Sequence, residues 1–167
     1  SPFTREFDPG VFVTWRTLDE ALSTAYAQKL TFFLALHGGD GENGVIQRKF
    51  EELKIAFTGS GSEASAKAFD KALTKELAKA KGARVAQERR LDTSNEAELR
   101  RVLAELLANS PRWVLKPQAD GSSHGLVHLR APDEIEAAAK KLHALKIPYL
   151  AEVFIEGREL TVGVVHQ

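Results

Sequence analysis

A lysine followed by a glycine- and serine-rich loop is the stretch of this sequence with the clearest chemical meaning. An apolar run over residues 113–115 ends at Lys116, and the loop Asp120-Gly-Ser-Ser-His-Gly125 follows shortly after. A lysine ammonium is a compact cation that can reach a phosphate, and glycines let backbone N–H groups approach an anion. Ser122 and Ser123 add two hydroxyl donors. The stretch predicts a strand, a phosphate-covering loop and a return strand, although Lys116 could equally be a solvent-facing lysine at a strand end.

Two glutamates and a second lysine are further candidates. Glu152 interrupts an apolar strand and Glu159 begins the next one, seven residues later across a glycine turn. Both carboxylates could face one cleft, and the simpler alternative is that they alternate toward solvent. Lys71 follows an aspartate at a helix junction, where a solvated helix face is the simpler interpretation.

His37 and Glu42 lie in a loop with four glycines in eight residues, directly after a predicted strand. Loops at the carboxyl ends of strands in open α/β sheets often bind ligands, so these side chains either line a site or belong to a polar turn. No histidine pair has the spacing of metal ligands. The sequence contains no P-loop, no G-x-G-x-x-G fingerprint and no G-x-S-x-G elbow. Because it has no cysteine, thiolate catalysis and disulfides are excluded.

The elements that must position these residues follow from apolar periodicity and from turn residues. Helices are predicted at about 17–28, 45–54, 63–69, 70–81, 96–109 and 135–145, and strands at 11–15, 31–36, 55–58, 84–91, 113–115, from 126, 149–155 and 159–167. The apolar run 31–36 is expected to be a strand buried on both faces. Alternating strands and helices predict an α/β protein with an α+β central part.

Composition limits the partners. Lys and Arg total 23 and Asp and Glu total 23, so no overall charge favours nucleic acid or an anionic membrane. No run is long enough for a membrane span and no signal peptide is recognisable, so the default expectation is a cytoplasmic protein. Methionine is absent even at position 1, and the last predicted strand reaches Gln167. We therefore expect a fragment of a longer protein.

Four motifs in order resemble those of the D-alanine–D-alanine ligases of the ATP-grasp family, over roughly residues 30–167. The matching segments are Ala35-Leu-His-Gly-Gly-Asp-Gly-Glu-Asn-Gly44, then Phe57-Thr-Gly-Ser-Gly61 with Ser65-Ala and Phe69-Asp-Lys71, then Leu115-Lys-Pro with Asp120-Gly-Ser-Ser-His-Gly125, and Leu150-Ala-Glu-Val-Phe-Ile-Glu-Gly-Arg-Glu-Leu-Thr-Val162. Their order makes the combination far more specific than any one motif. Asn43 departs from the family's usual aspartate, and Val153-Phe154 replaces its usual Lys-Trp pair.

The resemblance implies an ATP-dependent carboxylate–amine ligase that joins two D-alanines for peptidoglycan through an acyl phosphate. It implies that Lys71 and Lys116 contact ATP and that Glu159 holds the ribose hydroxyls. The adenine edge would be read by a hinge strand composed of Glu152, Val153, Phe154 and Ile155. Ser122 and Ser123 would close over the phosphates and the substrate, with a catalytic role shared by Glu42. His37, Glu42 and Ser122 would line the D-alanine site.

The resemblance also predicts what lies outside these residues. The family's opening substrate-binding segment is missing, and its magnesium ligands lie beyond residue 167, so the isolated chain is expected to be inactive. The expected domains are an incomplete N-terminal α/β domain over 1–68, a central ATP-grasp subdomain over 69–157, and the start of a third domain over 158–167. The family is commonly dimeric, which allows a homodimer. The alternatives are another ATP-grasp ligase with a different substrate and a non-catalytic nucleotide-binding module.

Overall fold

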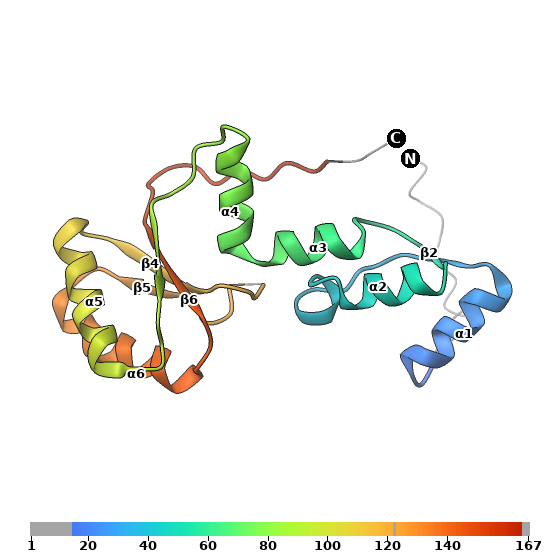
Figure 1. Cartoon of the computed structure of the whole chain (residues 1–167), viewed down its shortest axis with the longest axis horizontal. Helices are drawn as coiled ribbons and strands as arrows, with labels where there is room; N and C mark the ends of the chain where they lie inside the picture. Colours follow the sequence, from blue (N-terminus) through green and yellow to red (C-terminus); the bar gives the residue numbers. More distant parts are fainter. Residues whose placement is uncertain (1–14, 122, 165–167) are drawn as a thin grey trace, which may run out of the picture.

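The structure is a computed structural model that describes residues 15–121 and 123–164. Two groups of elements, each with its own hydrophobic cluster, are joined by a pair of short helices (Figure 1). The helices are α1 (Leu18–Gln28), α2 (Val45–Glu52), α3 (Ser62–Phe69), α4 (Lys71–Ala80), α5 (Glu96–Asn109) and α6 (Ile135–Leu145), with 3₁₀ turns η2 (Gly39–Gly41) and η3 (Pro132–Glu134). The strands are β1 (Thr31–Phe32), β2 (Ala56–Phe57), β3 (Glu88–Leu91), β4 (Trp113–Pro117), β5 (Val127–Leu129) and β6 (Tyr149–Val153).

The first group packs α1 and α2 around a short parallel pair, β1 and β2. Phe50 of α2 is buried and stacks on Phe32 with ring centroids 4.7 Å apart. The predicted strand over 31–36 is wrong in its length and burial, because pairing stops after Phe32 and Phe33 is 79% exposed. After Phe32 a side chain takes the place of the strand partner, because the Leu34 N–H donates a 3.0 Å hydrogen bond to Thr58 Oγ1.

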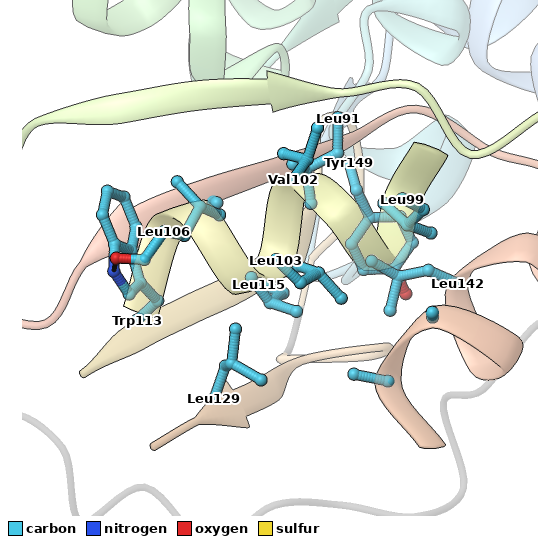
Figure 2. Close-up of a cluster of buried hydrophobic side chains, with 13 residues drawn as sticks. Leu91, Leu99, Val102, Leu103, Leu106, Trp113, Leu115, Leu129, Leu142 and Tyr149 are labelled. Atoms are coloured by element: carbon cyan, nitrogen blue, oxygen red, sulfur yellow. Dashed lines mark hydrogen bonds between the residues drawn. The ribbon is translucent and has the colours of Figure 1, made fainter. Parts of the chain in front are cut away.

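The second group is an antiparallel sheet in the order β3-β6-β4-β5, with α5 and α6 packed over one face. Strand β4 alternates in burial, so Trp113 and Leu115 point into the core under these helices. Figure 2 shows this cluster, in which the Trp113 indole N–H donates to the carbonyl of Leu106 at 2.7 Å. Because successive strand residues face opposite sides, Lys116 and Glu152 point to the other face of the sheet.

The helices of this group follow their sequence signals closely. The predictions of helices over 96–109 and 135–145 are confirmed by α5 and α6. Asn95 caps α5 by accepting a hydrogen bond from the Glu98 N–H at 3.1 Å. The 3.6-residue apolar stripe and the cap are local features, so they determine these boundaries without long-range information.

The helical stretch over 63–81 divides at Asp70, which has extended backbone angles of φ −82° and ψ 107°. Its side chain accepts a 3.0 Å hydrogen bond from the Leu73 N–H and so caps α4. After α4 the chain turns at Gly82, whose φ of +83° is left-handed. A residue with a left-handed backbone directly after the last turn is a common way for a helix to end.

Three strand predictions have different outcomes. The run 84–91 forms a ladder only from Glu88 to Leu91, opposite residues 149–152 of β6. The run 159–167 is not a strand within the described part, up to residue 164, and makes no ladder there. The run 11–15 lies almost entirely outside the described residues. No helix among the described residues is long and apolar enough to cross a lipid bilayer.

Candidate functional site

The N-terminus of α4 is fastened to the loop that follows β4. The Lys71 N–H donates to the carbonyl of Gln118 at 2.9 Å, and the Gln118 side chain donates to Asp70 Oδ2 at 2.8 Å. An isolated antiparallel bridge joins Asp70 to Ala119. These contacts place the first turn of α4 beside the glycine- and serine-rich loop predicted to cover a phosphate.

Lys71 points across this junction. Its ammonium donates to the carbonyl of Asp120 at 2.5 Å. Burial lowers the pKa of Lys71, the nearby Lys116 ammonium lowers it further, and Asp120 and Glu152 oppose the shift. Burial is the larger cause, and the repulsion between the two ammonium groups adds to it. An anion bound between them would relieve that repulsion.

Lys116 and Glu152 form the centre of the site on the sheet face opposite α5 and α6. The Lys116 ammonium donates to Glu152 Oε2 at 2.7 Å, and the side chains are 26% and 13% exposed. Lys75 lies 3.2 Å from Glu152 Oε1 and 2.8 Å from Glu88 Oε2. The face therefore carries alternating positive and negative groups supplied by β3, β4, β6 and α4.

The glycine- and serine-rich loop is held at its far end by the sheet. Gly125 has a left-handed φ of +72°, and its carbonyl accepts a 2.9 Å hydrogen bond from the buried Tyr149 hydroxyl. Burial raises the pKa of Tyr149, with a contribution from Asp120. Ser123 is exposed, with a left-handed φ of +58°. Ser122 lies outside the described residues.

The glycine loop of the first group meets the phosphate loop. Glu42 Oε2 lies only 2.9 Å from the position that a Cβ on Gly121 would occupy, so the carboxylate lies close to the backbone of the phosphate loop. His37 Nδ1 lies 3.6 Å from Glu42 Oε1, and the His37 side chain is 84% exposed. The structure thus brings His37 and Glu42 together and puts Glu42 against the loop from the other group.

Glu42 also lines a pocket of about 390 Å³ between α3 and the segments that follow β1 and β2. Its wall includes Gln47, which is 4% exposed and donates to the carbonyl of Gly41 at 2.7 Å. This bond holds the glycine loop in its turn. The pocket opens beside the junction of the two loops, where a small substrate could meet the phosphate region.

The predicted hinge, Glu152 to Ile155, leaves the sheet after Val153. The Val153 N–H donates to the carbonyl of Gln87 at 3.0 Å and the Phe154 N–H donates to the carbonyl of Arg112 at 2.9 Å. The Arg112 guanidinium lies 4.0 Å from the centre of the Phe154 ring. Two hinge amides are therefore used within the protein, and Ile155 is 68% exposed.

Glu159 is not brought to the other candidates. It is exposed, and within residues 15–121 and 123–164 it makes no ion pair or hydrogen bond. The expectation that Glu152 and Glu159 face one cleft is therefore not supported by a contact between them. Within the same residues no three histidine, aspartate or glutamate side chains gather closely enough to hold a metal ion.

Sequence reasoning missed Lys75 and Glu88. One signal was available for Lys75, because it follows Lys71 by four residues on a predicted helix and so shares its face. Glu88 had no local signal, since it reaches the site through its pairing with Glu152 across β3 and β6. Taken together, the site offers ammonium groups and loop donors suited to phosphate, and a carboxylate suited to a hydrogen-bond donor.

Comparisons with known proteins define first the class of fold. The structure is similar to the crystal structure of the D-alanine–D-alanine ligase from Bacillus anthracis, with a TM-score of 0.69 and 25% identity over 87% of this chain and 46% of that one. It is also similar to the VanG D-Ala:D-Ser ligase from Enterococcus faecalis, with a TM-score of 0.64 and 28% identity over 76% of this chain and 36% of that one. The chain therefore has part of an ATP-grasp fold.

Sequence comparison clearly identifies the kind of ligase that the chain resembles. The chain is 38% identical to the D-alanine–D-alanine ligase of Cupriavidus necator over 159 residues, which is 95% of this chain and 45% of that protein. No protein-family model matches the chain. The resemblance to D-alanine–D-alanine ligases is confirmed, and the chain spans slightly less than half the length of these curated relatives.

Proposed function

We propose that the chain is part of an ATP-dependent D-alanine–D-alanine ligase of peptidoglycan precursor synthesis and contributes most of its nucleotide site. The observation that carries the proposal is the convergence of Lys71 and Lys116, from α4 and β4, beside the loop over residues 120–125. Two partly buried cations with nearby backbone donors suit the phosphates of ATP.

The nucleotide fits the remaining groups as well. Glu152 Oε1 is buried and accepts no hydrogen bond among the described residues, so it has acceptor capacity for an adenine amino group. The amides of Val153 and Phe154 already donate within the protein. We therefore assign adenine contacts of the hinge to Glu152, to the Ile155 backbone and to carbonyl groups, and ribose contacts to Glu159.

The chemistry follows from these roles. The γ-phosphoryl group is transferred to the carboxylate of the first D-alanine, and ADP leaves. The amine of the second D-alanine then attacks the acyl carbon, forms the amide and releases phosphate. Phosphoryl transfer depends mainly on positioned cations and donors, which Lys71, Lys116 and Ser123 supply. The loop excludes water that would hydrolyse the acyl phosphate.

The substrate end of the site is assigned to the loop junction. Glu42 and His37 line it from the glycine loop, and Ser123 belongs to the phosphate loop on the other side. Ser122 is assigned to the same end only by its place in the motif. The contact of Glu42 with Gly121 supports this assignment, because it brings the two loops together. Several further expectations stay predictions. They are the magnesium ion and its ligands after residue 167, the homodimer, the cytoplasmic location, and the domain division at residues 68 and 157.

A second candidate within the same class concerns the substrate. The similarity to a D-Ala:D-Ser ligase supports an ATP-grasp ligase with a different second amine. Both candidates share the nucleotide site, so they differ in the product formed and not in the ATP contacts. Mass spectrometry of products from the complete protein, supplied with D-alanine and D-serine together, distinguishes the two.

The nucleotide site is tested by titrating the protein with ATP and measuring the dissociation constant by calorimetry. Lys116→Ala should weaken binding by about tenfold or more, because it removes a cation held beside the phosphates. Lys79→Ala is the matched control, since Lys79 lies on the exposed part of α4 and has no ion pair among the described residues. Equal affinities for the wild type and Lys116→Ala would remove this lysine from the site.

A further inference from the structure

A pair of carboxylates opposes each other beneath α4. Glu88 and Glu152 are register partners in the antiparallel pair β3 and β6, and their side chains are 23% and 13% exposed. Like charges directly opposite on one face of a sheet destabilise the pair, more so when they are shielded from water. The arrangement therefore requires a cation between the two strands.

Lys75 is that cation. Its ammonium lies 2.8 Å from Glu88 Oε2 and 3.2 Å from Glu152 Oε1, and its side chain is only 14% exposed. Lys116 adds a second ammonium at Glu152 Oε2, 2.7 Å away. The cluster thus contains two positive and two negative groups, and each oxygen of Glu152 faces a different lysine.

The two lysines bind Glu152 in different ways. Lys116 makes a directional hydrogen bond, whereas Lys75 Nζ, Glu88 Oε2 and Glu152 Oε1 are buried atoms without a hydrogen bond among the described residues. Lys75 therefore acts on Glu152 through charge at short range. A contact of this kind holds the charge of Glu152 while leaving its Oε1 lone pairs available.

This difference matters when Lys116 turns from Glu152 to a phosphate. Without Lys75, that movement would leave two facing carboxylates in a desolvated place with no cation, which is strongly unfavourable. With Lys75 in place, one cation still lies between Glu88 and Glu152 when Lys116 leaves. Lys71, one helical turn before Lys75 on the same face of α4, is directed instead to the phosphate loop.

We propose that Lys75 is a positioning residue that keeps a cation beside Glu152, so that the Lys116 ammonium can move from Glu152 to a nucleotide phosphate. The inference rests on the proposed nucleotide site. Helix α4 then has two roles. Lys71 contacts the phosphate region, and Lys75 offsets the negative charge of Glu152, the carboxylate assigned to adenine. Neither the motifs nor the comparisons assign a role to Lys75 or to Glu88.

The test measures dissociation constants of ATP and of adenosine, which has no phosphate, for the protein and its variants. Lys75→Met should weaken ATP binding by about tenfold, roughly 1.4 kcal/mol, because Lys116 is then held by two carboxylates. Adenosine affinity should change by less than about twofold, since the effect is on the phosphates. Lys79→Met is the control for losing one positive charge from α4.

A second change separates charge balance from structural support. Adding Glu88→Gln to Lys75→Met removes the opposing carboxylate and should restore ATP affinity to within about threefold of the wild type. Glu88→Gln alone should leave ATP affinity equal to that of the wild type or make it tighter, because Lys75 then pairs with the charge of Glu152 alone. This single variant keeps both lysines in the cluster, so it tests the inference even if Lys75→Met fails to fold.

The outcomes are distinct. Loss of ATP and adenosine affinity by the same factor, without restoration by Glu88→Gln, would show a purely structural role for Lys75 and overturn the inference. An unchanged ATP affinity in Lys75→Met, or weaker binding in Glu88→Gln alone, would overturn it too. If ATP does not bind the wild type, or if Lys116→Ala binds it normally, the proposed nucleotide site itself fails.

Discussion

Gly125, at the end of the phosphate loop, is the position where a single methyl group should have the clearest effect. The residue has a left-handed φ of +72°. A Cβ there would lie 2.7 Å from the Tyr149 hydroxyl and 2.9 Å from Pro117 Cγ. Both neighbours belong to the rigid sheet, so neither can move away as a flexible surface side chain would. Gly125→Ala therefore adds backbone strain and steric overlap at the same point.

The magnitude follows from these two effects. A left-handed conformation costs a non-glycine residue about 1–2 kcal/mol, and overpacking a well-filled site costs about 1–3 kcal/mol. Alanine recovers about 0.4–1 kcal/mol by restricting the unfolded chain. We expect Gly125→Ala to lower the free energy of unfolding by about 2–4 kcal/mol, partly because the Tyr149 hydroxyl is pushed away from its acceptor.

Gly82 provides the matched control. Its φ is +83°, and a Cβ there would meet nothing within 4 Å. Gly82→Ala thus has the strain without the overlap and should cost about 0.5–1.5 kcal/mol. Guanidinium titration of both variants, followed by circular dichroism, gives the free energies and shows through the slope whether the native state stays compact.

The difference in stability between the two variants measures the effect of the close contact at Gly125. If Gly125→Ala and Gly82→Ala differ by less than about 0.5 kcal/mol, the close approach of Gly125 to Tyr149 does not exist in solution. The ATP affinity of Gly125→Ala is a second measurement. Under the proposed function it should fall, because the loop loses its fixed end at the sheet.

Two further predictions concern charge and pH. Lys71→Met should reduce ATP affinity by about tenfold but change the free energy of unfolding by less than about 1 kcal/mol. The effect on stability is small because the change removes a stabilising hydrogen bond to Asp120 and, at the same time, a partly buried charge that Lys116 repels. A larger loss of stability in guanidinium titration would contradict this. Burial raises the pKa of Tyr149, so the hydroxyl keeps its proton to a higher pH in the folded state than in the unfolded state. The group therefore stabilises the protein at pH values below the ordinary tyrosine pKa of about 10, and this contribution is lost as the pH rises. The stability advantage of the wild type over Tyr149→Phe should therefore shrink above about pH 10 in guanidinium titrations at a series of pH values, and a constant advantage would show that Tyr149 is not buried at Gly125.

Local patterns in the sequence were enough to predict the helices and the type of chemistry. The apolar stripe of α5 and its Asn95 cap define the helix 96–109 because both depend on neighbours within one or two turns. Lys116 with the loop after it indicated a phosphate site, since an ammonium, glycines and hydroxyls suit an anion wherever the fold puts them. The order of the four motifs indicated a resemblance to D-alanine–D-alanine ligases, and the comparisons with known proteins confirm it.

Strand lengths and the partners of charged residues depended on the tertiary structure. The strand predicted over 31–36 pairs for only two residues, because a strand ends where its neighbour ends. The residues 159–164 read as a strand but form no ladder among the described residues, since an apolar alternation cannot supply a partner. Pairing joins segments distant in the chain, and no local pattern contains that information.

The site shows the same division between local and long-range information. Residue types and motif spacing alone indicated that Lys71, Lys116 and Glu152 are suited to bind a nucleotide. The position of Lys75 between Glu88 and Glu152 follows from the packing of α4 on β3 and β6, because three separate elements must meet to form that contact. Side-chain chemistry is a property of each residue, whereas its charge partners are set by the packing of α4 on the sheet.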